Sequence, residues 1–318
     1  ESLSGLIVGR LLIGLGVSAC LMAAFKAYVL WFSSERLAMI NGLQMVAGGL
    51  GALGATIPLQ NALSYTDWRG VFTGLAVITV FASICLWVFL PENKRTDEKL
   101  PSLKLQLKEM GEVFRSRIFW DIAPLAAISQ GANMAINGLW MKPWLRDVAG
   151  LNSDNAAQLL FVMTLAFIGG FLTLGIIAER LSQLFDIRPI SISVWGMTLF
   201  LFIQGTMIFG GFGSPLILVL LLGFFGTASV LVYAGYAQIF PKYLSGRVST
   251  ILNLLVFICA FILQWGVGVI IEIWPATETG YAPESYQAAL GVLFLLQAAG
   301  LIWYFLSLKF SRKQGVLI

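Results

Sequence analysis

Residues Val248–Trp274 read VSTILNLLVFICAFILQWGVGVIIEIW, and Glu272 is the one charged side chain among them. An α-helix crosses the hydrocarbon of a membrane with roughly 20 mostly apolar residues, so this run is long enough to span it. Its hydrophobic residues are continuous rather than alternating at every second position, which argues against a strand of a β-barrel. The stretch therefore predicts a transmembrane helix.

The composition of the whole chain has the same character. Of its 318 residues, 58% are hydrophobic and 11% are charged, and the mean hydropathy is +0.85. Soluble domains carry about 25% charged residues, so a soluble fold is excluded. Histidine is absent, and Cys20, Cys85 and Cys259 lie far apart within apolar runs, which favours free thiols over disulfides or a zinc site. We expect an all-α polytopic membrane protein that has no cofactor and is not an enzyme.

Nine apolar segments follow one another along the chain, each bounded by charged or turn residues. They cover approximately Leu3–Phe32, Leu37–Leu63, Trp68–Leu90, Ile118–Trp144, Ala156–Ala178, Pro189–Gly210, Pro215–Phe240, Val248–Trp274 and Tyr286–Leu308. We expect residues 1–90 to form a partial N-terminal half, residues 91–117 to form a linker, and residues 118–318 to form a C-terminal half of six helices.

The basic residues are unevenly divided between the two sets of connecting loops. Fifteen of the twenty Lys and Arg residues fall in the set that includes the linker and the end of the chain, and three fall in the opposite set. Basic loops stay on the cytoplasmic side, so the linker and the C-terminus are predicted to be cytoplasmic. In the linker, Leu103, Leu107, Met110 and Phe114 recur at helical spacing, which predicts an amphipathic helix at the membrane surface. Its bases face anionic lipid, and nucleic-acid binding is not implied.

Polar side chains at membrane depth are costly, so each is a candidate for contact with a solute. In the fourth segment such residues occupy a stripe about 80° wide at 100° per residue. They are Gln130, Asn133, Asn137 and Trp140. A water-filled cavity and hydrogen bonds between helices both explain this stripe, and we favour the cavity. The seventh segment repeats the spacing with Ser229, Tyr233 and Tyr236.

Arg10 lies only about 7 residues into the first segment, where a permanent charge needs a partner or water. A pathway role and snorkelling to the headgroups both remain open for it. No Asp or Glu falls in the middle of any segment, since Asp121, Glu179 and Glu272 all lie near ends. If transport is coupled to protons, the titrating group is therefore expected outside these nine segments, or another ion is used.

The chain also contains an internal similarity. The stretches Tyr28–Arg36 and Tyr236–Arg247 both have a Tyr, a Phe at the end of a helix, a short polar loop and then an Arg, with an insertion in the second. Both stretches are predicted on the same side of the membrane, one before the linker and one after it. This indicates two homologous halves.

Several motifs occur in order along the chain. GRLLIGLGVSA (Gly9–Ala19) has an Arg followed by a glycine pair, Gly14 and Gly16, and Arg36 follows this helix. DWRGVF (Asp67–Phe72) contains Trp68 and Arg69. GGFLTLGIIAERL (Gly169–Leu181) ends on Glu179 and Arg180. LWMKPWLRDVAG (Leu139–Gly150) ends the fourth segment.

Together these motifs resemble those of the major facilitator superfamily of secondary transporters. The resemblance implies that the nine segments match the fourth to twelfth helices of a twelve-helix fold, with the first three helices and their loop motif absent from this chain. It implies a small-molecule substrate and alternating access, with the first, fourth and seventh segments along the pathway. On this resemblance Arg10 serves binding or proton coupling. The residues that serve the conformational change are Gly14, Gly16, Arg36, Trp68, Arg69, Glu179, Arg180 and Arg247.

The Gly-Pro pair of antiporters is not met, because Thr56 and Ile57 separate Ala55 from Pro58. We therefore expect uptake of a small polar or anionic solute, as a symporter with a proton or another coupling ion. The protein is expected to be a monomer in a bacterial inner membrane. Two alternatives remain: an inactive or incomplete transporter, and a membrane-embedded enzyme, although no acid–base or metal cluster is apparent.

Overall fold

The computed structural model describes residues 3–18, 20, 23–24, 27, 44, 46–55, 57–89, 102–211, 213–275 and 280–313. Residues 1–50 and residues 51–318 form two compact units. Within the described residues the chain is helical without an extended strand, and six helices are long and apolar enough to cross a membrane. These six correspond to the third and the fifth to ninth predicted segments. The prediction of an all-α polytopic membrane protein is confirmed.

The described residues of the first unit include α1 (Leu3–Ser18), whose sequence is apolar apart from Arg10 and two serines. No side chain of α1 is buried. In the second predicted segment, helical residues 46–50 belong to the first unit and helical residues 51–54 to the second. The first two segments are thus described in part, and their predicted ends at Phe32 and Leu37 lie outside the described residues.

The second unit contains α4 (Ile57–Tyr65) and α5 (Trp68–Phe89), which contact one another. Asp67 caps α5, because its Oδ1 accepts a hydrogen bond of 2.9 Å from the N–H of Gly70. That bond is the main reason why the pKa of Asp67 is lowered, with Arg69 adding a smaller effect.

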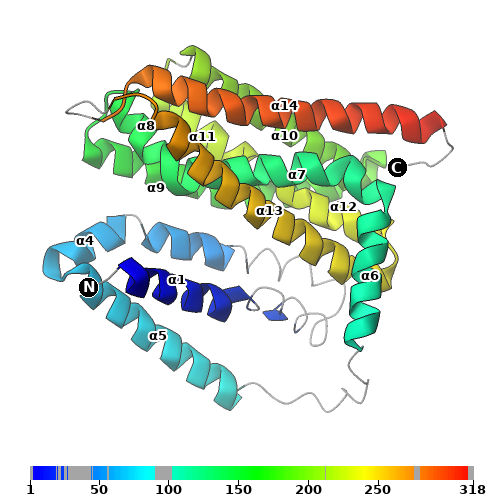
Figure 1. Ribbon diagram of the computed structural model, residues 1–318, viewed down its shortest axis with the longest axis horizontal. Coiled ribbons are helices and arrows are strands. Elements are labelled where there is room, and N and C mark those ends of the chain that lie inside the picture. Colours follow the sequence, from blue (N-terminus) through cyan, green and yellow to red (C-terminus); the bar gives the residue numbers. More distant parts are fainter. Residues whose placement is uncertain are drawn as a thin grey trace. The chain divides into compact units, whose positions relative to one another are not determined.

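The remaining helices form a bundle that Figure 1 shows from α6 to α14. The bounds are α6 (Leu103–Arg115), α7 (Arg117–Ala135), η1 (Ile136–Trp140), α8 (Met141–Asp147), α9 (Ser153–Phe185), α10 (Pro189–Phe209), α11 (Pro215–Phe225), η2 (Ala228–Val230), α12 (Leu231–Ile239), α13 (Lys242–Ile271) and α14 (Pro283–Lys313). Helix α7 packs against α13 and α14, α9 packs against α11, and α10 packs against α14.

Local chemistry sets several of these helix ends. Helices α10, α11 and α14 each begin at a proline, which suits the first helical turn because its missing N–H would have no partner there. Helix α9 begins after Asn152, whose Oδ1 accepts from the N–H of Asn155 at 2.8 Å. It ends at Asp186, which takes a left-handed conformation with φ 55°. Gly210 ends α10 in the same way with φ 72°.

Two clusters of buried apolar side chains hold the bundle together. One surrounds Met141, Leu145 and Leu222, towards the α8 end of α7. The other surrounds Phe119 and Ile251, towards the α6 end. The buried polar residues Ser129 and Asn133 lie on α7 where the two clusters meet, so the packing at both ends of the helix fixes their position.

The helix predicted in the linker is present as α6, which begins after Ser102 and ends at Ser116. Figure 1 shows α6 running crosswise to α7 and α13. An ion pair of 3.0 Å between Glu109 Oε2 and Arg247 Nε joins α6 to α13. Its placement at the membrane surface stays a prediction.

Two neighbouring glycines of α9 give a test of this packing. A Cβ on Gly170 would lie 2.6 Å from the backbone oxygen of Phe224 on α11, whereas a Cβ on Gly169 would meet nothing within 4 Å. We expect Gly170→Ala to lower the free energy of unfolding by about 1–3 kcal/mol, because backbones must separate. Gly169→Ala should cause no loss. Thermal unfolding in detergent measures both, and equal stability of the two variants would contradict this packing.

Candidate functional site

The polar stripe of the fourth predicted segment lies where α7 changes its winding. Gln130 and Asn133 belong to the last turns of α7, and Asn137 and Trp140 belong to the π-helical turn η1. Such wide turns inside α-helices are frequent at functional sites. The regular spacing of 100° per residue used for the stripe therefore holds only as far as Ala135.

Two asparagines of this stripe bind one another. The Nδ2 of Asn137 donates to the Oδ1 of Asn133 at 2.6 Å, and Asn133 is buried. The Oε1 of Gln130, one turn earlier, is buried and has no hydrogen-bond partner within the described structure. Buried polar groups are normally paired, so this unpaired acceptor is a candidate contact for a ligand.

Opposite this stripe, the predicted seventh segment is interrupted at its middle. Helix α11 ends at Phe225, a short 3₁₀ turn η2 follows, and α12 continues the same membrane span from Leu231. A Cβ on Gly226 would collide with Oδ1 of Asn133, so the interruption lies directly against the asparagine pair. Interrupted membrane helices of this kind place backbone and polar groups near the centre of the bilayer, where transporters bind solutes.

The 3₁₀ turn contains Ser229, which is 1% exposed. Its Oγ is buried and makes no hydrogen bond to any part of the chain that the structure describes. The turn is supported from α10, where Ser193 Oγ donates to the backbone oxygen of Ala228 at 2.7 Å. Ser229 is therefore held in a fixed position while its own hydroxyl is left unused.

Trp140 and Gln264 link η1 to α13. The Nε1 of Trp140 donates to the backbone oxygen of Gln264 at 3.0 Å, and the Nε2 of Gln264 donates to the backbone oxygen of Met134 at 3.1 Å. Gln264 is thus a contact between helices. These bonds stabilise the π-helical turn.

The two tyrosines of the seventh segment lie further along α12. Tyr233 donates to Oδ1 of Asn253 on α13 at 3.4 Å. Tyr236 is fully buried, stacks on Phe119 at 5.6 Å between ring centroids, and donates to the backbone oxygen of Phe119 at 2.6 Å. The structure thus brings Asn133, Asn137 and Gly226 together, and it places Tyr236 in the core near the start of α7.

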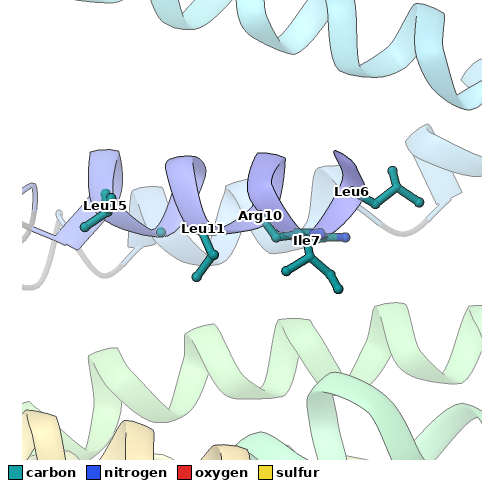
Figure 2. Close-up of a pocket in the computed structure, with 6 residues that line it drawn as sticks. Leu6, Ile7, Arg10, Leu11 and Leu15 are labelled. Atoms are coloured by element: carbon teal, nitrogen blue, oxygen red, sulfur yellow. The ribbon is translucent and has the colours of Figure 1, made fainter. Parts of the chain in front are cut away.

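Arg10 belongs to the first unit and is exposed on α1. Figure 2 shows its side chain on one face of α1, among Leu6, Ile7, Leu11 and Leu15. Gly14 completes the lining of this shallow hollow, which α1 alone provides. Gly14 and Gly16 are exposed, and a Cβ on either would meet nothing within 4 Å.

The other motif residues lie near helix ends. Trp68 and Arg69 begin α5, with the Arg69 guanidinium 4.4 Å from the centroid of the Trp68 ring and 3.3 Å from Oδ2 of Asp67. Arg180 is exposed within α9, which runs on to Phe185 rather than ending at the predicted Ala178. Arg247 pairs with Glu109. Arg36 and the side chain of Glu179 lie outside the described residues.

Sequence reasoning missed a buried carboxylate at the end of α8. Only 1% of the Asp147 side chain is exposed, and it accepts from Arg146 Nε at 2.6 Å, from Tyr286 OH at 2.6 Å and from the N–H of Tyr281 at 3.3 Å. Burial raises the pKa of Asp147, but these hydrogen bonds lower it by more, so the pKa is lowered overall. Through these hydrogen bonds Asp147 links the end of α8 to the start of α14.

The side chains around the asparagine pair and Ser229 are neutral groups that form hydrogen bonds. Amide and hydroxyl groups can recognise a polar solute, and they cannot by themselves perform acid–base catalysis. Among the residues whose placement is described, no group of three or more Cys, Asp or Glu side chains is arranged to hold a metal ion.

Comparison with known proteins adds one result to this geometry. A sequence model described as Major Facilitator Superfamily matches residues 1–263, which is most of the chain. No curated protein matches the chain significantly.

Proposed function

The chain belongs to the major facilitator superfamily of secondary transporters, and from this premise we propose that it carries a small polar or anionic solute into the cell by alternating access. The observation that carries the proposal is the contact between the interrupted span Pro215–Ile239 and the asparagine pair of α7. Proteins of this family are integral membrane proteins that bind small-molecule substrates.

The proposed solute site consists of Gln130, Asn133, Asn137 and Ser229. The free Oε1 of Gln130 and the free Oγ of Ser229 supply hydrogen bonds that no described residue uses. A solute with hydroxyl, amide or carboxylate groups can form hydrogen bonds with these side chains. Each such bond gives a partner to a buried polar group that is otherwise unpaired. Arg10 is a separate candidate contact, on α1, for a negatively charged solute.

For the coupling, we propose a symporter that uses a proton or another ion. The described candidate membrane spans hold no acidic side chain near their middle, and on α7 the buried Asp121 lies near the start of the helix, 3.9 Å from Arg117. Uptake is favoured over export because the antiporter Gly-Pro pair is absent from the sequence around Pro58.

The proposed organisation has two halves joined by the linker 91–117, with residues 118–318 as the C-terminal half. We place the protein as a monomer in a bacterial inner membrane with its C-terminus in the cytoplasm. The excess of bases in the linker and at the end of the chain supports this orientation.

A solute screen followed by uptake tests the proposal. Polar and anionic solutes are first ranked by the rise in melting temperature of the purified protein, because a ligand that binds only the folded state stabilises it. The best solute is then offered in radioactive form to proteoliposomes, with and without a pH gradient or a sodium gradient.

We expect accumulation above the external concentration in the presence of one of the two gradients. Flux that is independent of both gradients would contradict symport and leave facilitated transport. Absence of flux for every stabilising solute, in vesicles that retain folded protein, would contradict the transport function itself.

A further inference from the structure

Helix α6 has three distinct faces. Taking 100° per residue, Val113 lies about 180° around the helix from Lys104. Val113 is fully buried against the bundle. On the same side, Glu109 pairs with Arg247 of α13 at 3.0 Å. This face fixes how the rest of α6 is presented.

The opposite face is basic. Lys104, Lys108 and Arg115 fall within about 40° of one another on the helix surface. All three are exposed. Of the two acids of α6, Glu109 is paired with Arg247, and Glu112 lies beside Lys108 and accepts from Tyr243 OH at 3.4 Å, so among the described residues three bases stand against one unpaired acid. The basic face therefore carries a local excess of positive charge away from α13.

An exposed apolar stripe runs beside the basic face. Leu107 and Phe114 lie about 60–80° from Lys104 around the helix. They are 60% and 41% exposed. Gly111 lies between this stripe and the bases, and a Cβ there would meet nothing within 4 Å. Gly111, which has no side chain, thus separates the apolar side chains from the charged side chains.

The apolar stripe continues onto the outer surface of the bundle. The Nε1 of Trp120 on α7 donates to the backbone oxygen of Phe114 at 2.8 Å, and the Nε1 of Trp303 on α14 donates to the backbone oxygen of Trp120 at 2.8 Å. Both tryptophans are exposed. Because α14 is long and apolar enough to cross a membrane, we expect its exposed Trp303 to face lipid, and tryptophan is typical of the membrane interface. We therefore expect the stripe of α6 at the same lipid boundary.

We propose that this surface, which we call the elbow, binds the headgroup of an anionic phospholipid. The elbow is formed by Lys104, Leu107, Lys108, Phe114, Arg115 and Trp120. The bases contact the phosphate, and the acyl chain lies along Leu107, Phe114 and Trp120. Charge complementarity selects the anionic headgroup, and the neighbouring apolar stripe selects a lipid over a free phosphate ion. The site is independent of the proposed solute site.

The ion pair between Glu109 and Arg247 gives this site a route to the transport machinery. Lipid that orients α6 also orients the first turns of α13, because the two helices are joined at that pair. The elbow thus makes the position of the linker sensitive to the anionic lipid content of the membrane.

Brominated lipids test the proposal directly, because bromine quenches the fluorescence of nearby tryptophans. The full chain in neutral detergent is titrated with brominated phosphatidylglycerol and, separately, with brominated phosphatidylcholine. We expect preferential binding of phosphatidylglycerol. The triple variant Lys104→Gln, Lys108→Gln and Arg115→Gln should weaken this binding about 100-fold, since each base near an anionic surface contributes about 1 kcal/mol.

Two controls accompany the triple variant. The charge-preserving variant Lys104→Arg, Lys108→Arg and Arg115→Lys should bind phosphatidylglycerol as the unmodified chain does. The double variant Arg188→Gln and Lys309→Gln, which removes exposed bases elsewhere, should also retain the preference. Raising the salt concentration from about 50 to 500 mM should weaken binding to the unmodified chain through screening.

Three results would overturn the proposal. Equal binding of both lipids by the unmodified chain would remove the selectivity. Unchanged affinity in the triple variant would remove the bases from the site. Displacement of the lipid by millimolar inorganic phosphate would identify an ion site in place of a lipid site.

Discussion

Replacing Asn133 with leucine is expected to reduce solute uptake by about 5- to 100-fold while the protein stays folded. Leucine has the same branched outline as asparagine, with methyl groups in place of Oδ1 and Nδ2, so the close contact with Gly226 is retained and becomes tighter. The substitution removes the acceptor of Asn137 Nδ2 and the central polar group of the proposed site. A solute group left without its partner, or an unpaired buried donor, costs about 1–3 kcal/mol, which is about 5- to 150-fold in affinity.

The matched control for this variant is Asn155→Leu. Asn155 is exposed near the start of α9, and the contact it makes with Asn152 uses its backbone N–H rather than its side chain. Uptake of the stabilising solute into proteoliposomes is measured for both variants at equal amounts of folded protein. If Asn133→Leu transports at the rate of Asn155→Leu, the asparagine pair is not part of the solute site.

Replacing Asp147 with alanine is expected to lower the free energy of unfolding by about 2–4 kcal/mol, because several donors lose one acceptor at once. Tyr286 is 1% exposed, so its hydroxyl cannot turn to water without local opening of the bundle. Arg146 is about half exposed and can be solvated, which keeps the effect below that of a fully buried ion pair. Asp154→Ala, at an exposed position of α9, should change stability by no more than about 0.5 kcal/mol.

The pH dependence of stability gives a second reading of the same contact. The pKa of Asp147 is lowered in the folded state, so the carboxylate stabilises the fold above its ordinary pKa of about 3.9. That contribution is lost as the pH falls below this value and passes through the folded pKa. Melting temperature measured between about pH 3 and pH 7 should therefore fall more steeply for the unmodified chain than for Asp147→Asn. Parallel profiles would contradict the role of the carboxylate.

The sequence predicts the helices of this fold well where local chemistry decides them. Pro189 and Pro215 were expected to begin helices and do begin them, because a proline suits the first helical turn. The spacing of Leu107, Met110 and Phe114 correctly predicts α6, since one amphipathic period is sufficient to identify such a helix. The end of α9 was less predictable, because Arg180 ends the apolar run although the helix continues.

The interruptions that build the candidate site could not be predicted, because distant residues stabilise them. The π-helical turn relies on Gln264, which is 130 residues from Met134 in the sequence, and η2 relies on Ser193, which is 35 residues from Ala228. Gly226 is a local signal for a weak helix, since glycine is unfavourable in a helix interior. The contacts of Asp147 join it to Tyr286, 139 residues away, and no sequence pattern indicated them.

Ser229 offers the most direct test of the central claim, that the interruption of the span Pro215–Ile239 binds the solute. Its Oγ is buried and has no partner among the described residues, so Ser229→Ala should leave the melting temperature of the unliganded protein unchanged or raised. Equilibrium binding of the stabilising solute is the measurement. The account predicts about 2- to 10-fold weaker binding to Ser229→Ala than to the unmodified chain, as for a lost hydrogen bond of about 0.5–1.5 kcal/mol. Equal affinity, with equal stability, would contradict it.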